Sequence, residues 1–378
     1  MNMAELKQEL ITYAHSIGID KIGFTSASPF SELKNCLRRQ QELGYQSGFE
    51  ESDIEKRTNP KLLLEEAASI IAIAIAYPSK MKNPPQGKKG ARRGIFCRAS
   101  WGMDYHTILR EKLASLEIFL QEKVPGCRLR SMVDTGELSD RAVAERAGIG
   151  WSAKNCAVIT PEYGSYVYLG EMITDLPFES DDLMEDQCGD CRLCLDVCPT
   201  GALVQGGQLN SQKCVAYLTQ TKGFLPDEYR TKIGNRIYGC DTCQTVCPKN
   251  KGKTNWMHDV FQPDPEVAKP LLEPLLTISN RDFKQTYGHI SGSWRGKKPI
   301  QRNAIIALAH FKEEAAVPTL IEIFQNDERP VIRGTAAWAL GKIGGEGVKE
   351  ILQEGLLREK EDSVRLEIQK GLSRFNGQ

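Results

Sequence analysis

Twelve cysteines stand out in this chain of 378 residues, because seven of them form two closely spaced runs. The first run reads Cys-x2-Cys-x2-Cys-x3-Cys-Pro and begins at Cys188; the second reads Cys-x2-Cys-x3-Cys-Pro and begins at Cys240. In bacterial two-cluster ferredoxins such a run gives three thiolates to one [4Fe-4S] cluster, and its last cysteine ligates the other cluster. The spacing therefore predicts two [4Fe-4S] clusters, which carry single electrons.

The second run is one ligand short, and Cys214 lies between the runs as a natural replacement. Each cluster then has four thiolates. We assign Cys188, Cys191, Cys194 and Cys247 to cluster one, and Cys198, Cys214, Cys240 and Cys243 to cluster two. The alternative is structural zinc, which four cysteines in two pairs also hold. Three further cysteines are expected to be buried thiols: Cys36, Cys127 and Cys156.

An α/β domain over residues 1–177 is expected to accompany these ligands, because helical and strand patterns alternate there. The run 70–77 is continuously apolar, which suits a central buried strand. The other elements expected are helices over 3–17, 31–43, 62–68, 104–123 and 139–147, strands over 21–25 and 129–133, and a hairpin of 157–160 with 166–174.

The rest of the chain divides into three parts. Residues 178–255 are dominated by cysteine, glycine and proline, so bound metal must organise this ferredoxin-like domain. Residues 256–298 read as a connecting segment. In residues 299–378 the pairs Ala307-Leu308, Ala339-Leu340 and Gly371-Leu372 recur every 32 residues, which indicates a helical solenoid made of helix pairs such as 300–311 and 315–325.

Composition and termini limit the class of protein. Basic and acidic residues number 49 each, so the net charge is zero. No apolar run approaches the roughly 18 residues that span a membrane, and the N-terminus lacks signal-peptide features. We therefore expect a cytoplasmic protein without a membrane partner, whose cysteines are not disulfide-bonded. Neither a P-loop nor a complete G-x-G-x-x-G after a strand occurs, which leaves nucleotide-cofactor binding unsupported.

Four segments resemble the epoxyqueuosine reductase family, whose members complete queuosine in tRNA. They are CRASWGMDYH at 97–106, VDTG at 133–136 with Asp140-Arg141, AGIGWSAKN at 147–155 and YGCDTCQ at 238–244. The resemblance covers nearly the whole chain and departs mildly at Ser100 and Ala153. It implies a cobalamin-binding α/β domain related to reductive dehalogenases, a ferredoxin-like domain with two [4Fe-4S] clusters, and all-α HEAT-like repeats.

The implied reaction reduces epoxyqueuosine to queuosine by converting an epoxide into an alkene and water. Cobalamin reduced through the two clusters would supply the electrons, and the leaving oxygen needs a positioned acid. Asp134 matches the family's proposed proton donor, and burial beside a corrin should raise its pKa. The alternative is that Asp134 caps the following helix, although Ser139 and Asp140 are better placed for that.

Other roles follow from the same resemblance. Asp104, Tyr105 and His106 can bind substrate or relay protons, or simply pack at the start of a helix. Arg141 can pair with Asp134 or Asp140, either as a catalytic residue or as part of a structural ion pair. The residues expected to bind cobalamin are Arg57, Cys97, Asp134, Ser152, Asn155, Val158 and Leu169. We expect a small electron-carrier protein as the electron donor, and a monomer.

Two basic runs predict a track for tRNA phosphates, with solvated loops as the alternative. Residues 80–98 contain no acid, and residues 281–302 contain only Asp282. The tRNA-binding residues expected are Lys88, Lys89, Arg92, Lys222, Arg295, Lys297, Lys298 and Arg302. The aromatic residues expected to stack on an unpaired anticodon base are Trp101, Tyr105, Tyr287 and Trp294.

Two other classes of function account for parts of the pattern. A dehalogenase acting on a small molecule also uses corrin and clusters, but it needs no solenoid, and the twin-arginine leader usual for such enzymes is absent from the sequence. A non-enzymatic electron carrier needs no α/β domain of this size. Protein that binds no corrin would favour the carrier.

Overall fold

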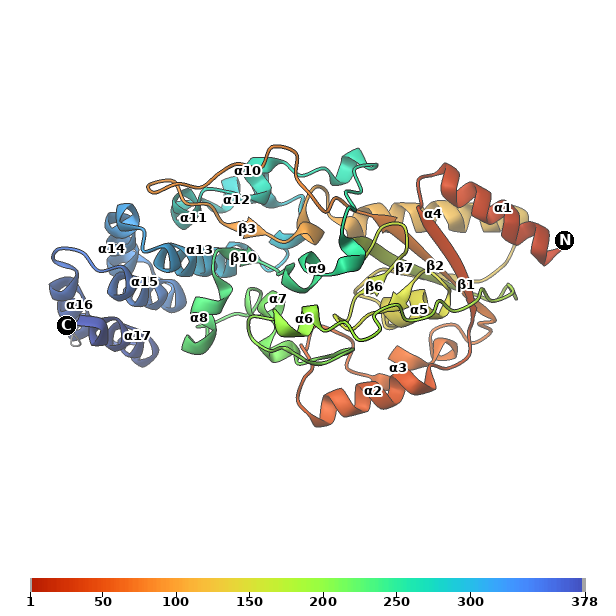
Figure 1. Cartoon of the computed structure of the whole chain (residues 1–378), viewed down its shortest axis with the longest axis horizontal. Helices are drawn as coiled ribbons and strands as arrows, with labels where there is room; N and C mark the ends of the chain where they lie inside the picture. Colours follow the sequence, from red (N-terminus) through yellow and green to blue (C-terminus); the bar gives the residue numbers. More distant parts are fainter. Residues whose placement is uncertain (1, 376–378) are drawn as a thin grey trace. The chain divides into compact units, whose positions relative to one another are not determined.

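The computed structural model describes residues 2–375 (Figure 1). These residues form two compact units, each assembled from three separated segments. The first unit comprises residues 2–80, 103–214 and 241–262, and the second comprises residues 81–102, 215–240 and 263–375. The expected domain bounds stay a prediction, and the end of the last expected domain, residues 376–378, lies outside the described residues.

A four-stranded antiparallel sheet in the order β1-β2-β7-β4 forms the centre of the first unit. Its strands are β1 (Lys21–Ser26), β2 (Ser69–Ala76), β4 (Leu129–Met132) and β7 (Val167–Thr174). All eight residues of β2 are buried, as expected for a central strand that is covered on both faces. The strands predicted over 21–25, 70–77 and 129–133 are thereby confirmed.

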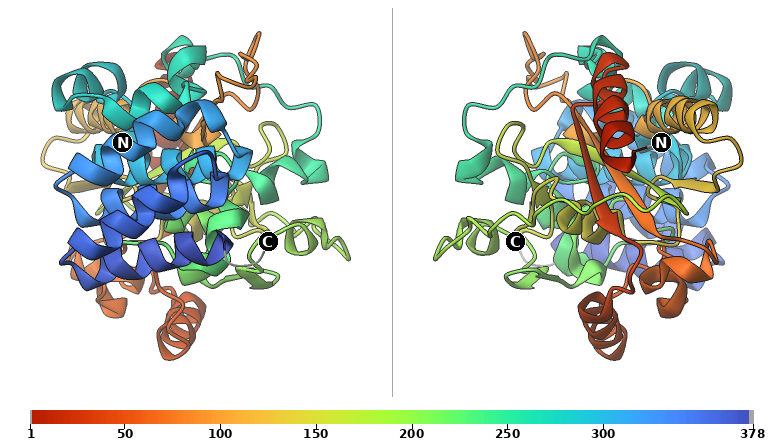
Figure 2. Two further views of the ribbon diagram at one scale, coloured as in Figure 1. Left: turned by 90° about the vertical axis from the view of Figure 1, so that its left-hand side faces the viewer. Right: turned by 90° about the vertical axis from the view of Figure 1, so that its right-hand side faces the viewer.

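Helices cover both faces of this sheet, as the right-hand view in Figure 2 shows for the first unit. Helix α5 (Asp140–Arg146) contacts β1, β2 and β7, and its apolar side chains share a core with Ile70, Ala72 and Ala74. Side chains alternate along a strand, so the odd-numbered residues of β2 face the other side. Helices α1 (Met3–Ser16) and α4 (Tyr105–Lys123) pack against each other, and α4 also contacts β4 and β7.

Shorter elements complete the first unit. Before the cysteine runs they are α2 (Ser31–Glu42), α3 (Ile54–Thr58), η1 (Pro60–Leu62), β5 (Trp151–Ser152) and β6 (Val158–Ile159). Around the cysteine runs they are α6 (Leu193–Asp196), β8 (Leu203–Gln205), β9 (Gln208–Leu209), η3 (Ser211–Lys213), α9 (Thr242–Thr245), η4 (Pro248–Asn250) and η5 (Asp259–Phe261).

The predicted hairpin of 157–160 with 166–174 is wrong. Strand β6 pairs with β5, whereas β7 pairs with β2 and β4. Only an isolated bridge joins Thr160 to Gly164 across the expected turn. Both edges of β7 are occupied, so the backbone groups of β6 must find another partner.

The predicted helix over 62–68 is also wrong, because only the 3-10 turn η1 forms there. The backbone N–H of Ala68 donates to the carbonyl of Thr174, which draws the chain into the extended sheet. A helix of seven residues is too short to form without strong packing, so the sheet prevails over the helical propensity of this leucine- and alanine-rich segment.

The second unit is mainly helical. It begins with β3 (Ile95–Phe96), which pairs in parallel with β10 (Arg236–Tyr238). Its remaining short elements are η2 (Arg98–Ser100), α7 (Val215–Leu218), α8 (Asp227–Ile233), α10 (Pro265–Ala268), α11 (Leu272–Thr277), α12 (Asn280–Tyr287), η6 (Ser291–Ser293), η7 (Glu314–Ala316) and η8 (Ser373–Phe375). Among residues 2–375 no helix is both long and apolar enough to cross a membrane.

Five longer helices form the repeats predicted from the 32-residue period, and they stack in the left-hand view of Figure 2. They are α13 (Lys297–Phe311), α14 (Val317–Asn326), α15 (Pro330–Ile343), α16 (Val348–Arg358) and α17 (Asp362–Leu372). A Cβ atom at Gly341 of α15 would lie 2.3 Å from Gly371 of α17, so glycine permits this close crossing. The repeats share one hydrophobic core with β3, β10 and α11, so they are not a separable cap.

Candidate active site

Asp134 lies in the loop between β4 and α5, where the sequence predicted a proton donor. Its backbone has φ +52°, a left-handed conformation that is uncommon outside glycine. Its N–H donates to Asp140 Oδ2 at 2.8 Å, and its own Oδ2 lies 3.3 Å from His106 Nε2. The side chain is 58% exposed, and Asp134 makes no helix-capping bond to α5.

His106 connects Asp134 to Asp104 at the start of α4. Asp104 caps the helix by accepting from the His106 N–H, and the same oxygen lies 2.7 Å from His106 Nδ1. Partial burial alone would lower the pKa of His106, but the two carboxylates outweigh it and raise the pKa to about 9. His106 is therefore an imidazolium at neutral pH, hydrogen-bonded to an acid at each ring nitrogen.

Stacked aromatic rings hold this imidazolium in place. The Tyr105 ring stacks on the His106 ring at 4.1 Å and on the Tyr168 ring at 4.5 Å between centroids. Tyr168 belongs to β7 and also stacks on Tyr77 at 4.4 Å. The Asp104-Tyr105-His106 segment thus starts the helix and carries polar groups to Asp134, and its role in binding substrate or relaying protons stays a prediction.

Arg141 does not pair with Asp134 or Asp140, contrary to one sequence expectation. Its guanidinium donates to the carbonyl of Cys156 instead. Arg57, on α3, is close enough to Arg141 for their charges to interact, and it makes no side-chain hydrogen bond among residues 2–375. Arg57 therefore keeps donors for an oxygen-rich ligand.

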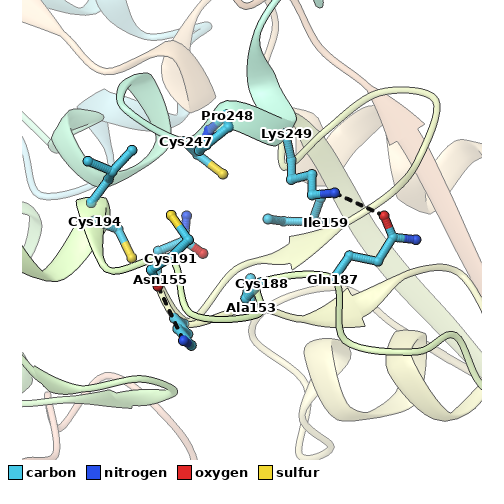
Figure 3. A pocket seen from close by; sticks show the side chains of 12 residues that line it. Ala153, Asn155, Ile159, Gln187, Cys188, Cys191, Cys194, Cys247, Pro248 and Lys249 are labelled. Atoms are coloured by element: carbon cyan, nitrogen blue, oxygen red, sulfur yellow. Dashed lines mark hydrogen bonds between the residues drawn. The ribbon is translucent and has the colours of Figure 1, made fainter.

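Four cysteines assigned to cluster one line a single cavity of about 390 Å³, counting its open mouth (Figure 3). They are Cys188, Cys191, Cys194 and Cys247. Figure 3 shows Cys247 on the opposite side of this space from Cys191 and Cys194, although 56 positions separate Cys191 from Cys247 in the sequence. The last cysteine of the second run thus joins the first three of the first run, which is the exchange that ferredoxin-like spacing predicts.

Donors around this cavity suit an anionic iron–sulfur cluster. Burial raises the pKa of Cys188, while hydrogen bonds from the Lys154 N–H and the Trp151 indole oppose the rise. Trp151 is 1% exposed, and its Nε1 has no oxygen or nitrogen acceptor among the described residues. Such a buried donor facing sulfur stabilises thiolate charge.

The cysteines assigned to cluster two lie in or beside four different elements. Cys198 follows α6, Cys214 precedes α7, Cys240 follows β10, and Cys243 lies in α9. Burial alone would raise the pKa of Cys198, but nearby backbone N–H groups outweigh it and lower the pKa, which favours a thiolate ligand. The assignment of these four ligands stays a prediction.

Three of the residues expected to bind cobalamin lie on one short hairpin. Ser152 pairs with Val158 across β5 and β6, and Asn155 lies in the turn between them. Asn155 is buried, its Nδ2 has no partner among the described residues, and it also borders the cysteine cavity. The Ser152 hydroxyl donates to Glu145 at 2.8 Å. Leu169 lies in β7, on the adjoining sheet.

Cys97 belongs to the second unit, where it precedes η2. A Cβ atom at Gly239 would lie 2.2 Å from Cys97 Sγ, and Gly239 has φ +70°, so only glycine fits there. Of the cysteines without an assigned cluster, Cys127 is buried and Cys156 half-buried. Cys36 is exposed, so the expectation of a buried thiol is wrong for it.

The eight predicted tRNA-binding side chains all belong to the second unit, but they differ in availability. Arg302 is 1% exposed and donates to the carbonyl oxygens of Leu218 and Thr221, so its assignment to tRNA is wrong. Its charge anchors α13 instead. Arg92 pairs with Glu313 at 2.8 Å. Exposed lysines remain at four of the predicted positions, Lys88, Lys89, Lys222 and Lys298, and Lys89 also pairs with Glu314.

Trp294 is the exposed aromatic residue near these lysines in the sequence. It is 54% exposed, and the Arg295 guanidinium lies 4.8 Å from its ring centre. Its Nε1 donates to Gln220 at 2.8 Å, which fixes the ring. Trp101 and Tyr287 are both 5% exposed, so the expectation that they stack on an RNA base is wrong.

Comparison with known proteins decides the family. The chain is 69% identical to an epoxyqueuosine reductase of Bacillus anthracis over 372 residues, which cover 98% of both chains. It is 67% identical to the epoxyqueuosine reductase of Bacillus subtilis, over 98% of this chain and 96% of that one. This chain belongs to the epoxyqueuosine reductase family.

Solved structures of epoxyqueuosine reductases share its fold. One, with an epoxyqueuosine-modified tRNA-Tyr stem loop, matches at 66% identity with a TM-score of 0.98 over all of both chains. Another, from Bacillus subtilis, has its Asp134 catalytic loop swung out of the active site and matches at 66% identity with a TM-score of 0.97, over 99% of this chain and 100% of that one.

Family models match three parts of this epoxyqueuosine reductase family member. Residues 57–135 match "Epoxyqueuosine reductase QueG, DUF1730", residues 187–250 match a 4Fe-4S double cluster binding domain, and residues 296–373 match HEAT repeats. The predicted iron–sulfur and HEAT-like parts of the fold are therefore confirmed. Sequence reasoning missed Trp151 and Lys154 beside the cysteines, although both belong to the AGIGWSAKN segment that carried the family resemblance.

Proposed function

We propose that this chain reduces epoxyqueuosine to queuosine in tRNA. The reaction consumes two electrons and two protons, breaks both C–O bonds of the epoxide, forms a C=C bond and releases water. The observation that carries this proposal is 69% identity to an epoxyqueuosine reductase across 98% of both chains. A relative solved with an epoxyqueuosine-modified tRNA stem loop supports tRNA as the substrate.

Complementation tests this proposal in cells. A bacterial strain that lacks its own epoxyqueuosine reductase should accumulate epoxyqueuosine in tRNA, and expression of this chain should restore queuosine. Mass spectrometry of digested tRNA distinguishes the two nucleosides. Unchanged epoxyqueuosine in cells that contain the full-length, iron-loaded protein would contradict the proposal.

Electrons reach the site through the double cluster domain. Cluster one would be held by the four cysteines of the cavity and stabilised by the indole N–H of Trp151. Lys154 secures the same loop by donating to the carbonyl of Cys191 at 3.2 Å. Because a cluster moves one electron at a time, two successive transfers from a small electron-carrier protein would be needed.

Cobalamin is the further cofactor that we propose, and when bound it would supply a strongly reducing cobalt centre. The residues present fit such a group. Arg57 and the buried Asn155 amide both keep unused donors, which the amide and phosphate oxygens of cobalamin can accept. Ser152 and Val158 would present the β5–β6 hairpin to the same ligand.

Asp134 would deliver a proton to the departing epoxide oxygen. Its neighbour His106 is protonated at neutral pH and lies 3.3 Å away, so it can both orient the Asp134 carboxyl and supply it with a proton. The epoxide oxygen leaves far more readily when it is protonated than when it must leave as a bare alkoxide. The proton path thus runs from His106 through Asp134 to the substrate.

The pH dependence of the reaction should report on His106. Its pKa is raised from the ordinary 6.5 to about 9, so the charge that contacts Asp134 is present at neutral pH and is lost as pH rises through about 9. We expect the single-turnover rate to decline on that alkaline side. Asp104→Asn removes one of the carboxylates that raise the pKa, so the decline should begin about one pH unit lower.

The control for this pH profile is Asp175→Asn, which removes an acid that bonds only the Arg128 N–H in its loop. Its alkaline decline should coincide with that of the unmodified protein. An identical profile for Asp104→Asn would show that His106 does not govern the rate.

Binding of the tRNA should depend on Trp294. Stacking of a base on an exposed aromatic ring contributes roughly 1–3 kcal/mol, so Trp294→Ala should weaken affinity for an anticodon stem loop about tenfold or more. Fluorescence anisotropy at fixed salt measures this affinity. The matched control is Leu357→Ala on α16, which removes a side chain that is 86% exposed. Equal affinity of the two variants would remove Trp294 from the tRNA interface.

A further inference from the structure

Two acidic side chains meet beneath the Asp134 loop. Glu171 lies in β7, directly across from Met132 at the end of β4, and is 1% exposed. Asp140 is the first residue of α5. The two carboxyl groups lie within hydrogen-bonding reach of each other. No donor from residues 2–375 reaches either carboxyl oxygen of Glu171.

A hydrogen bond between two carboxyl groups requires a proton, because ionised carboxylates only accept. Burial raises the pKa of Asp140 to about 6, and burial together with the neighbouring acids raises that of Glu171 well above its ordinary value. The charges that face the pair are Asp134, which disfavours further negative charge, and Arg57 on α3, which attracts Asp140. Glu171 forms no ion pair among the described residues.

The outer end of this pair reaches the catalytic loop. Asp140 Oδ2 accepts from the Asp134 N–H at 2.8 Å, and this bond helps to hold Asp134 in its unfavourable left-handed conformation. A protonated Glu171 can donate to Asp140 and leave Asp140 ionised, which makes it a stronger acceptor for that N–H. If Glu171 lost its proton, a buried carboxylate would face the half-buried carboxylate of Asp140, and their repulsion would drive Asp140 away.

We propose that Asp140 and Glu171 share one proton and form a positioning pair that fixes the Asp134 loop in its catalytic conformation. The catalytic role of Asp134 rests on the proposed function, but the loop contact and the shared proton do not. The pair touches no substrate. It acts through the Asp134 backbone, and its hold weakens as rising pH removes the shared proton.

Two substitutions of equal length at Glu171 separate its hydrogen bond from its volume. Glu171→Gln retains a donor for Asp140, whereas Glu171→Met fills the same space without one. Hydrogen–deuterium exchange of the cluster-loaded full chain reports on the backbone N–H groups of residues 133–139. We expect Glu171→Gln to match the unmodified protein and Glu171→Met to exchange at least about tenfold faster in this loop.

Catalysis should show the same order. Glu171→Met should lower kcat without changing KM for the tRNA stem loop, because the loop is displaced while the tRNA surface is intact. Glu171→Gln should retain kcat and, lacking an ionisable group, should keep the loop protected at alkaline pH where the unmodified protein loses protection. Glu117→Gln, which changes an acid bonded by Ser131 of β4, serves as the matched control and should leave exchange unchanged.

A second measurement needs neither substrate nor the methionine variant. Infrared difference spectra across pH should show the C=O stretch of a buried carboxylic acid in the unmodified protein and lose it in Glu171→Gln. Absence of this band in the unmodified protein would overturn the shared proton. Equal loop exchange in the methionine and unmodified proteins, or equally fast exchange in both Glu171 variants, would overturn the positioning role. If epoxyqueuosine were not reduced at all, hydrogen–deuterium exchange and infrared spectra would still show whether Asp140 and Glu171 share a proton and position the loop.

Discussion

Replacing Asp134 with asparagine should lower the single-turnover rate of epoxide reduction by about 100-fold or more. A positioned acid contributes roughly 10² to 10⁴ to the rate of a reaction in which the leaving oxygen must be protonated. Asparagine keeps the shape of the side chain and its contact with His106, but it cannot deliver a proton. Iron content should stay at the level of the unmodified protein, because Asp134 lies outside the cysteine cavity.

Glu137→Gln is the matched control for this variant. Glu137 belongs to the same loop, and its carboxyl pairs with Arg130 rather than with the proposed proton path. Its replacement should change the rate by no more than a few fold. Should the asparagine variant turn over as fast as Glu137→Gln, another group must protonate the oxygen, and His106 would be the first to examine because it lies 3.3 Å from Asp134.

Replacing Cys247 with alanine should remove cluster one while cluster two stays. Cys247 comes from the second cysteine run, yet it lines the cavity with the three cysteines that begin the first run. Iron content should therefore fall from about eight to about four atoms per chain, since each cubane holds four. Electron delivery from a carrier protein should fall by at least about 100-fold, because one of the two stations on its path is lost.

Cys156→Ala provides the control, since Cys156 lies outside both proposed ligand sets and its carbonyl, which the variant keeps, accepts from Arg141. This variant should retain about eight iron atoms. If Cys247→Ala also retained them and accepted electrons at the unmodified rate, the assignment of the cluster ligands would have to be redrawn.

The sequence predicted well those features that a local pattern determines. The apolar run at 70–77 became the buried central strand β2, because such a run is stable only when both faces are covered. The period of 32 residues predicted the stacked helices of the second unit. Cysteine spacing also placed Cys247 with the first run, and Cys247 lines the same cavity as Cys188, Cys191 and Cys194, although the ligand assignment itself stays a prediction.

Features that depend on distant partners were not predictable. The segment at 62–68 has helical propensity, but the Ala68 N–H donates to the carbonyl of Thr174 at the end of β7. The local sequence does not indicate this distant partner. The predicted pairing of 157–160 with 166–174 was wrong because β7 already pairs with β2 on one edge and with β4 on the other. Arg302 belongs to a basic run, but its guanidinium is buried and donates to the carbonyl groups of Leu218 and Thr221.

The catalytic arrangement shows the same division. Sequence reasoning named Asp134 and His106 separately, but their contact spans 28 residues and depends on α4 lying against β4. The Asp140–Glu171 pair was missed, because a glutamate in an apolar strand gives no sign of which acid it meets. Long-range contacts of this kind decide the protonation of the site, and only the fold reveals them.

We propose that the two clusters, cobalamin and the Asp134 loop together remove oxygen from epoxyqueuosine in tRNA. The most direct measurement is a single turnover of anaerobically purified protein, loaded with iron and cobalamin and reduced, on an epoxyqueuosine-bearing tRNA stem loop, with the nucleosides identified by mass spectrometry. We predict conversion to queuosine, with the loss of one oxygen atom and no other change of mass. Fully loaded and reduced protein that binds the stem loop and leaves epoxyqueuosine intact would contradict the account.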